Sequence, residues 1–343
     1  MKGLFMQVQG SPNRRPLIID GLSCAALTRD QVTRTLSGGV SVMNLTATRP
    51  AAGLEDALIQ LEIARKTIGS MSDIARIVTT VSEIEAAHNA GLLGVILGAQ
   101  NSLMVQPDIR ILASFKSLGM RILQPTYNER NAFGYGAPYT MDGDGGITES
   151  GRAWLAMMES LGLLVDLSHC GHRTSADYIG AAKAPMIFSH ANAYAVCPSP
   201  RNKTDELVRG IAKTGGLIGA VTWAPIVRFD ARPTIDDYVD HVSHLVKVGG
   251  VDHVAFASDL PEGFPSDPAK WERMWGKDGL YPNITGVLGD WYRYGNHAMK
   301  GMETITEVPA IWDKMRSRGF HESEIEKIAS GNWMRVLREV WSV

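Results

Sequence analysis

Short apolar runs that are rich in β-branched residues alternate along this chain with longer segments in which apolar residues recur at helical spacing. Such alternation is typical of βα units repeated around a parallel sheet. The runs with the length and composition of strands are 17–20, 39–47, 74–81, 92–100, 120–128, 163–169, 185–192, 216–223 and 253–260. A closed barrel of this kind has eight strands, so this set holds one strand too many.

The segments between these runs predict helices. In 54–68, leucines and alanines recur every three or four residues and share one face. Segment 148–161 begins at Thr148, a residue type that caps helix N-termini, and continues as an apolar stripe. The remaining predicted helices are 204–214, 235–248 and 322–341.

Two stretches break this rhythm. Residues 129–146 are dense in Gly and Asp, and residues 261–302 are rich in Gly, Pro, Trp and Tyr. Loops of this length in a compact barrel are more often functional than idle, and both follow strands, at the end where βα loops build active sites. Since no repeat, low-complexity tract or linker interrupts the chain, we expect one domain over residues 1–343 with 129–146 and 261–302 as active-site loops.

The charge balance narrows the choice of partners. The 343 residues carry 34 Lys and Arg against 36 Asp and Glu, a formal net charge of −2, with the basic residues dispersed. Such a chain has no concentrated positive charge that would attract nucleic acid or anionic lipid. The opening residues MKGLFMQVQGSPNRRPL lack the apolar core of a signal peptide, no run approaches the roughly 20 apolar residues of a membrane span, and three cysteines cannot all pair. We therefore expect a cytoplasmic protein with a small-molecule substrate.

Polar residues close several of the predicted strands. They are Asp20, Gln100, Asn101, Thr126, Tyr127, Asn128, Ser168, His169, Ser189, His190, Ser258 and Asp259. In a parallel barrel the carboxyl ends of the strands converge on one rim. His169 and His190 end successive strands, and neutral imidazole is the commonest nitrogen ligand of metals. Asp259, at the last strand, could supply an oxygen ligand or a base.

Several motifs, in this order, carry a family resemblance. They are GITESGR at 146–152, VDLSH at 165–169, FSHANAYAVCPSPRN at 188–202, FASDLPEG at 256–263 and EIEKIASGNWMRVLREVW at 324–341. Together they resemble the membrane (renal-type) dipeptidases, a branch of the amidohydrolase-like metallopeptidases. The resemblance implies a distorted single (β/α)8 TIM-like barrel that holds two zinc ions and hydrolyses dipeptides or related small amides. It also implies that 74–81 is the surplus strand.

The resemblance assigns roles residue by residue. It implies that His169 and His190 bind one metal ion and that Asp259 is the catalytic base or a ligand. It implies that Arg201, with Asn202, holds a substrate carboxylate. In the family a histidine stands where this chain has Tyr127, so Tyr127 is expected to line the pocket and to act in catalysis or substrate binding.

At three further positions the chain departs from the family pattern. Leu22 and Cys24 stand in place of a His-x-Asp pair, and Gln100 stands in place of the bridging glutamate. Two zinc ions carry four positive charges, and a neutral amide cannot offset them as a carboxylate would. We therefore expect one zinc ion at most, or none, with Gln100 and Cys24 as weak candidates to complete a shell around the two histidines.

The expected function is metal-dependent hydrolysis of a small dipeptide-like or carboxylate-bearing amide. A metal ion would activate water, Asp259 would accept its proton, and Arg201 would fix the acid group. Two alternatives stay open: a barrel that has lost hydrolysis and binds a metabolite or partner, and a lyase or isomerase in which Tyr127 is the acid. Assembly as a homo-oligomer also stays open.

A second pair of histidines, His241 and His244, has H-x-x-H spacing within the predicted helix 235–248. No glutamate lies between them as in H-E-x-x-H. We therefore expect a packed or solvated helix face there, without a metal ion.

Overall fold

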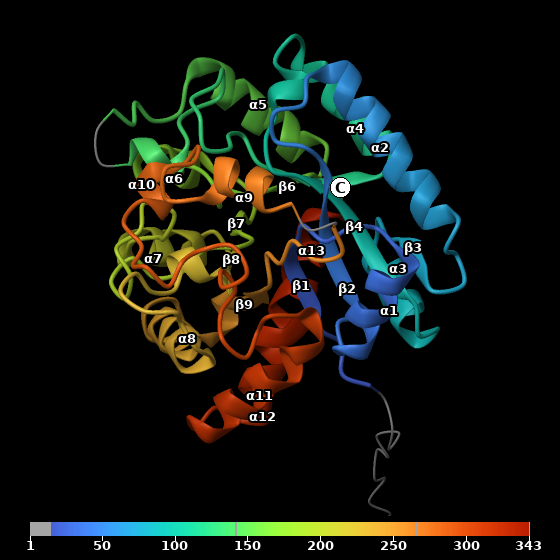
Figure 1. The fold of residues 1–343 in the computed structure, drawn as a ribbon. Helices are drawn as coiled ribbons and strands as arrows, with labels where there is room; N and C mark the ends of the chain where they lie inside the picture. The colour runs from blue at the N-terminus through green and yellow to red at the C-terminus, as the bar shows by residue number, and fades with distance from the viewer. Residues whose placement is uncertain (1–14, 141–142, 265–266, 343) are drawn as a thin grey trace, which may run out of the picture.

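In the computed structural model, which describes residues 15–140, 143–264 and 267–342, parallel strands curve into a barrel with helices outside it (Figure 1). Around the barrel the order is β1 (Ile19–Ser23), β2 (Val42–Thr48), β4 (Leu93–Ala99), β5 (Met120–Leu123), β6 (Leu164–Val165), β7 (Ile187–Phe188), β8 (Leu217–Val221) and β9 (Val254–Ala257). A bridge between Asp166 and Ile187 joins β6 to β7. The Asp259 N–H donates to the Leu22 carbonyl, 3.0 Å, and joins β9 to β1.

The surplus strand is β3 (Ala75–Ile77), which lies within the predicted run 74–81. β2 takes one edge of β4, so β3 and β5 share the other edge: β3 pairs with Leu93–Val95 and β5 with Leu97–Ala99. β3 therefore lies beside the barrel and is not one of its eight strands. The prediction that 74–81 is the extra strand is confirmed.

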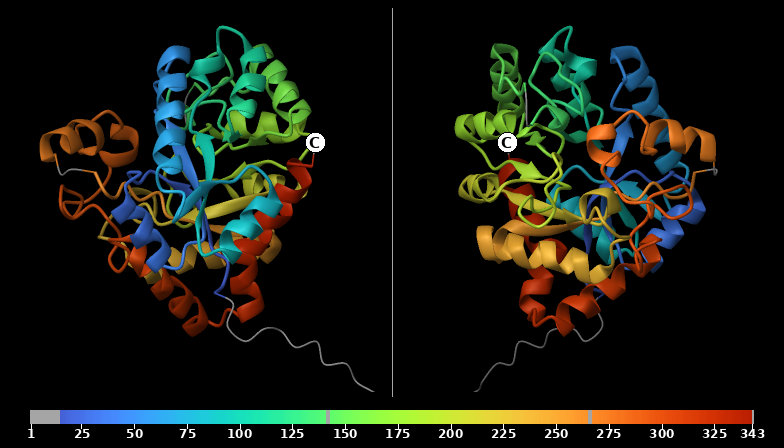
Figure 2. Two further views of the ribbon diagram at one scale, coloured as in Figure 1. Left: turned by 90° about the vertical axis from the view of Figure 1, so that its right-hand side faces the viewer. Right: turned by 60° about the vertical axis from the view of Figure 1, so that its left-hand side comes forward.

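The predicted helices form, and further ones complete the outer layer (Figure 2). They are α1 (Arg29–Ser37), α2 (Leu54–Gly69), α3 (Val81–Asn89), α4 (Leu112–Ser117), α5 (Glu149–Ser160), α6 (His172–Ala181), α7 (Asp205–Lys213), α8 (Ile235–Gly249) and α11 (Val308–Ser317). The Thr148 hydroxyl caps α5 by accepting the Gly151 N–H. The predicted helix 322–341 is divided into α12 (Glu322–Glu326) and α13 (Asn332–Val340) by a π-helical turn, Lys327–Gly331.

Three strands of the barrel end at least four residues before the predicted runs do. The runs 120–128, 163–169 and 185–192 give strands that end at Leu123, Val165 and Phe188. Beyond these points the backbone N–H groups of Ser168 and Ser189 bond a carboxylate, Asp166, in place of a neighbouring strand. The polar strand-end residues thus lie on irregular segments at the rim.

The barrel interior is filled at its amino end. Each of the eight strands contributes one fully buried side chain to one apolar cluster: Ile19, Val42, Ile96, Ile122, Leu164, Ile187, Leu217 and Ala255. Trp333 and Leu337 of α13 belong to the same cluster. A Cβ on Gly21 would lie 2.5 Å from the Ser189 carbonyl oxygen and 3.1 Å from the Trp333 ring, so only glycine fits there. α13 therefore closes the end of the barrel opposite the polar rim.

Buried Asp166 joins the short strands on one side of the barrel. Its carboxylate accepts the N–H and hydroxyl groups of both Ser168 and Ser189, and also the Gln124 amide at 2.6 Å. Gln124, Ser168 and Ser189 follow β5, β6 and β7, of which the last two are only two residues long. Side-chain bonds to one charge replace the ladder bonds that are missing.

Asp20 does the same at the closure of the barrel. It accepts the Ser258 N–H at 2.7 Å, the Ser258 hydroxyl at 2.5 Å and the Leu22 N–H at 3.3 Å, and so ties β9 to β1. Burial raises the pKa of Asp20 to about 7, although these three donors act in the opposite direction.

The two long loops lie at the polar rim. In the described part of 129–146, which includes a short 3-10 turn at Ala137–Tyr139, the Ala137 N–H donates to the His169 carbonyl at 2.7 Å. The segment 261–302, orange in Figure 1, carries α9 (Pro268–Trp275) and α10 (Pro282–Thr285). No helix within the described ranges has both the length and the apolar composition needed to cross a membrane. The sequence prediction that the opening residues lack a signal-peptide core concerns residues 1–17. Of these, residues 1–14 lie outside the described ranges.

Replacing Asp166 by alanine should lower the free energy of unfolding by at least about 3 kcal/mol, because each buried donor left without an acceptor costs about 1–3 kcal/mol. Urea denaturation measures this loss. The control is Asp73→Asn, which removes an exposed ion pair with Arg29 and should cost less than about 1 kcal/mol. Equal effects of the two variants would contradict the inference that Asp166 joins the segments after β5, β6 and β7.

Asp20 should make the folded state less stable as the pH rises. Its pKa is about 7 in the fold against an ordinary 3.8, so the unfolded chain releases the proton first and stability falls between about pH 4 and pH 7. In Asp20→Asn the amide can donate to the Ser258 hydroxyl without ionising. Unfolding free energies of both proteins from pH 3 to pH 9 should differ by an amount that changes through this window and is constant above it. A constant difference throughout would contradict the raised pKa.

Candidate active site

The rim brings the predicted site residues together in two neighbouring clusters. The imidazole cluster consists of Tyr127, His169, His190 and Arg201, from the segments after β5, β6 and β7. The carboxylate cluster consists of Cys24, Thr46, Gln100 and Asp259, from β1, β2, β4 and β9. The charges of Arg201 and Asp259 each act on the pKa of the other, so the two clusters lie near each other.

His169 is held as a neutral ring with one nitrogen available. Its Nδ1–H donates to the side-chain oxygen Oδ1 of Asn128 at 2.8 Å, so Nε2 carries a lone pair. That lone pair accepts from Nη2 of Arg201 at 3.1 Å. Burial, and then the charge of Arg201, lower the pKa of His169 well below its ordinary value. The ring is therefore an acceptor at its Nε2.

His190 has the same tautomer for a different reason. The Ser189 hydroxyl donates to Asp166 at 2.6 Å and must therefore accept the Nδ1–H of His190, 2.7 Å away. This leaves the Nε2 lone pair, which is fully buried and has no partner. The carboxylate of Asp166 thus acts on the ring through the Ser189 hydroxyl. Hydrogen bonds to the second ring nitrogen orient metal-ligating histidines in proteins. Burial again lowers the pKa of His190 well below its ordinary value.

Arg201 is a buried cation without a carboxylate partner in the described chain. Its side chain is 1% exposed, and its terminal nitrogens donate to the carbonyls of Ser168 and His190. The Nε–H has no partner. Burial lowers the pKa of the guanidinium. A buried charge normally pairs with an opposite one, so this group is suited to an anionic ligand.

The carboxylate cluster is centred on Asp259. Its Oδ1 accepts the Cys24 thiol at 3.2 Å, and the Gln100 amide donates to Cys24 at 3.5 Å and to Thr46 at 2.8 Å. Burial raises the pKa of Asp259 to about 6 and raises that of Cys24 well above its ordinary value. Cys24 is therefore a neutral thiol, a poorer metal ligand than a thiolate.

The backbone at Asp259 is unusual. Its φ of 51° lies in the left-handed region, where it is the one residue other than glycine in the described chain. Asp tolerates this conformation better than most residues, but it persists only where the surroundings impose it. Such positions concentrate at functional sites.

Asn202 is turned away from the site. Its amide donates to the carbonyls of Cys197 and Ile226, both at 2.8 Å, and its oxygen accepts the Asn192 N–H at 3.0 Å. Because the loop uses both polar atoms, the expectation that this side chain binds substrate is not supported. Asn202 instead holds the loop that carries Arg201.

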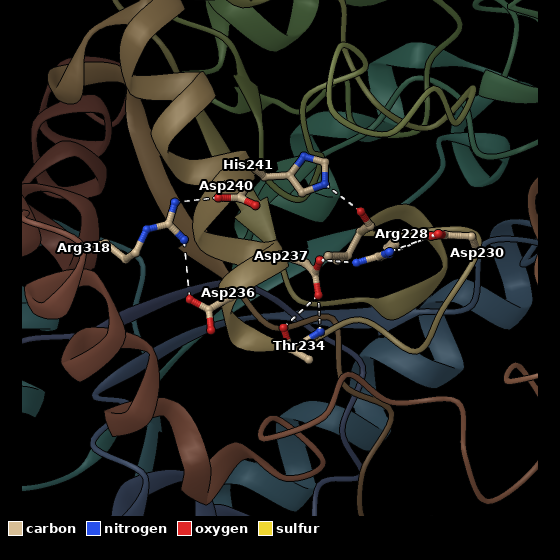
Figure 3. Close-up of polar contacts among 9 residues, drawn as sticks. Arg228, Asp230, Thr234, Asp236, Asp237, Asp240, His241 and Arg318 are labelled. Atoms are coloured by element: carbon tan, nitrogen blue, oxygen red, sulfur yellow. Dashed lines mark hydrogen bonds and ion pairs between the residues drawn. The ribbon is translucent and has the colours of Figure 1, made fainter.

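The histidines of α8 do not form a pair. His241 is fully buried, accepts the Ala193 N–H at 3.2 Å and donates to the Val227 carbonyl at 2.9 Å, so it joins the loops after β7 and β8. It lies beside a surface network in which Arg228 binds Asp230 and Asp237 (Figure 3). His244 contacts Asp205 instead, at 2.8 Å.

Residues that were not predicted from the sequence also shape the site. Thr46, which accepts a bond from the Gln100 amide, lies one residue before the end of the predicted strand 39–47, where polar residues are expected to reach the rim. Asp166 and Ser189 lie inside the motifs VDLSH and FSHAN, but spacing does not show that Asp166 binds Ser189 or that Ser189 binds His190. Lys203, fully buried, donates to the Cys170 carbonyl at 2.7 Å and lies 4.8 Å from the centre of the Phe188 ring.

These donors do not fit a dinuclear zinc centre. Within the described ranges, no three His, Cys, Asp or Glu side chains form a group that could hold a metal ion. Leu22 has no donor atom, and the Gln100 amide is bonded to Thr46 and Cys24. The unpartnered Nε2 of His190, with Nε2 of His169, fits one ion at most, provided that Arg201 releases His169.

Sequence comparison gives this geometry a family context. The sequence model of a family described as membrane dipeptidase (peptidase family M19) matches residues 23–288 and 282–343. A protein of Schizosaccharomyces pombe (strain 972 / ATCC 24843) named as an uncharacterized dipeptidase is 30% identical over 270 residues, 77% of this chain and 64% of that protein. The chain thus matches less than two thirds of that relative's length.

Solved structures share the fold. An amidohydrolase from Pseudomonas aeruginosa is 29% identical, with a TM-score of 0.83 over 96% of this chain and 97% of that one. A metallo peptidase from Rhodobacter sphaeroides is 21% identical and has a TM-score of 0.78 over 95% of this chain and 100% of that one. The predicted amidohydrolase-type barrel is confirmed.

The purified protein, loaded with zinc and dialysed, should retain no more than one ion per chain by elemental analysis. His169→Ala and His190→Ala should each abolish that binding. The control, His244→Ala, removes an imidazole of the outer helix and should leave it unchanged. Two retained ions, or retention by His190→Ala, would contradict the ligand assignment.

Proposed function

The chain belongs to the membrane dipeptidase family, peptidase family M19, and we propose that it hydrolyses a small amide or dipeptide-like molecule that bears a carboxylate. The observation that carries this proposal is the Arg201 guanidinium, which is 1% exposed and lacks a carboxylate partner in the described chain. A substrate carboxylate would supply the missing charge, and an arginine can bind it through two nitrogens. The unpartnered Nε–H of Arg201 is one such donor.

We place at most one divalent ion, with zinc as the proposed identity, at His169 and His190. When bound, such an ion supplies Lewis-acid polarisation of a carbonyl. The two imidazoles are prepared for this role because each donates its Nδ1–H to a fixed acceptor and keeps Nε2 unprotonated. Binding of a substrate carboxylate would draw the Arg201 guanidinium toward it and release the lone pair of His169.

Asp259 is the proposed base. With a pKa of about 6, Asp259 is ionised at neutral pH and can accept a proton. Because this pKa lies near the working pH, the protonated group can also release the proton again. Oδ1 accepts the Cys24 thiol, so Oδ2 would accept a proton from the attacking water and pass it to the leaving nitrogen. The neutral thiol of Cys24 binds this carboxylate, and the Gln100 amide in turn binds Cys24.

Tyr127 is the proposed hydrogen-bond donor to the carbonyl oxygen as charge develops on it. Its ring stacks on His169, with centroids 4.1 Å apart and planes at 25°. Burial raises the pKa of its hydroxyl well above the ordinary value, so the group stays protonated. A protonated phenol next to the reacting carbonyl serves as part of an oxyanion hole.

One observation favours a second candidate function. Nη2 of Arg201 bonds the lone pair of His169 that a metal ion would need. If Arg201 keeps this position, the barrel binds a carboxylate-bearing metabolite without hydrolysing it. Metal content and hydrolysis, measured together, distinguish the two.

Hydrolysis should be found in a screen of dipeptides and N-acyl amino acids followed by mass spectrometry in the presence of zinc. Turnover of unmodified L,L- and L,D-dipeptides should lie well below the enzyme median of about 10 per second, because the bridging carboxylate is missing.

Asp259→Asn should lower kcat by about 10²–10⁴-fold while the protein keeps its metal.

Arg201→Met should lower kcat/KM at least about 30-fold for a substrate with a carboxylate, since an unpaired partner of a buried charge pair costs 2–5 kcal/mol or more. The same variant should have a much smaller effect on the matching carboxamide. Arg209→Met, which alters an exposed arginine of α7, is the control. Absence of any hydrolysis, with carboxylate binding intact, would favour the binding-only function.

A further inference from the structure

A continuous row of aromatic rings runs from the imidazole cluster across the rim. Tyr281 meets Tyr127 edge to face, with centroids 6.2 Å apart and planes at 75°. Trp275 lies 5.1 Å from Tyr281, and Trp223 lies 5.4 Å from Trp275. We refer to Tyr127, Tyr281, Trp275 and Trp223 as the aromatic wall. Its first ring stacks on His169, so the wall begins at the reacting centre.

The wall is assembled from segments far apart in the sequence. Tyr127 follows β5 and Trp223 follows β8, whereas Trp275 ends α9 and Tyr281 precedes α10. The segment 261–302, orange in Figure 1, thus spans the rim between two strand ends. Outside the wall it is held by its own aromatic contacts, among them Trp271 with Tyr292 at 5.2 Å and with His297 at 5.1 Å.

The rings of the wall are supported but not covered. Trp223 and Tyr281 pack against a small apolar core that contains Val221 and Ile284. Tyr281, Trp275 and Trp223 nevertheless remain partly exposed. Partly exposed aromatic side chains beside a buried charged site are typical of the apolar part of a ligand pocket.

The four side chains of the wall are themselves uncharged. In the described chain, the cations that lie over aromatic rings are Arg130, on Tyr135, and Lys203, on Phe188, and neither ring belongs to the wall. The charges of Asp259 and Arg201 act on the pKa of Tyr127, the first residue of the wall. The charge of Glu129 acts on Tyr281. A substrate would therefore meet its ionic partner at Arg201 and an aromatic surface beyond Tyr127.

We propose that the aromatic wall binds an aromatic or large apolar side chain of the substrate, so that the preferred substrates are carboxylate-bearing amides or dipeptides containing such a side chain. This inference rests on the proposed function, because it concerns the substrate of that same site. Aromatic rings favour offset and edge-to-face contacts with centroids 4.5–7 Å apart. Successive rings of the wall meet one another at centroid distances within this range.

The kinetic test uses dipeptides in which Ala, Leu, Phe or Trp stands on either side of Gly. In at least one of the two series, kcat/KM should be at least about 10-fold higher for Phe or Trp than for Ala. Trp275→Leu and Trp223→Leu should each reduce this ratio at least about threefold, because they lower kcat/KM for the Phe- and Trp-containing substrates more than for the Ala-containing one. Trp275→Phe should restore most of the preference.

The matched control is Trp271→Leu, on the same helix as Trp275 but packed against Tyr292 and His297. It should keep the preference. The ratio measured on the unaltered protein does not depend on how the variants fold. Equal kcat/KM for Ala and Phe, or equal loss in Trp271→Leu and Trp275→Leu, would overturn the assignment of the wall.

A binding measurement separates this inference from the proposed function. Equilibrium dialysis of unaltered protein should show tighter binding of 3-phenylpropionate than of propionate, and Trp275→Leu should remove the difference. If this result is found without hydrolysis of any amide, the wall is supported and the proposed function fails. Hydrolysis without aromatic preference overturns the wall alone, and failure in both assays overturns both.

Discussion

The hydrogen bonds of buried Asp166 are the constraint on which both the fold and the site depend. Two strands of the barrel are only two residues long, and this carboxylate supplies the connections between the ends of β5, β6 and β7. It also binds the Ser189 hydroxyl, and so obliges that hydroxyl to accept the Nδ1–H of His190. One buried carboxylate therefore joins the short strands of the barrel and fixes the tautomer of a site histidine.

The two clusters carry one cation, Arg201, and one carboxylate, Asp259. Arg201 is bonded directly to a neutral imidazole, that of His169. Leu22 and Gln100, which the family resemblance places at ligand positions, add no charge. A site with this balance is suited less to several cations than to one anionic group paired with Arg201. The aromatic wall adds apolar surface that begins at the ring of His169.

Much of the architecture could be predicted from the sequence. The alternation of apolar runs and helical segments predicted a parallel barrel, because strands buried on both faces must be continuously apolar. Polar residues at the strand ends predicted which positions would meet, and His169, His190, Arg201 and Asp259 do lie at one rim. The predicted strands extended past the ends of β5, β6 and β7; after β6 and β7 the N–H groups of Ser168 and Ser189 bond Asp166 in place of a neighbouring strand.

Only the tertiary structure decided how the site residues are used. Asn202 follows Arg201 in the motif, yet its amide is spent on Cys197 and Ile226, which are brought to it by the folding of two loops. The aromatic wall joins residues 127, 223, 275 and 281, whose contacts have no periodic signature. The physical reason is range: period and residue type are local properties that fix helices, strands and their buried faces. Hydrogen-bond partners and ring contacts are chosen among groups that meet only when distant segments pack.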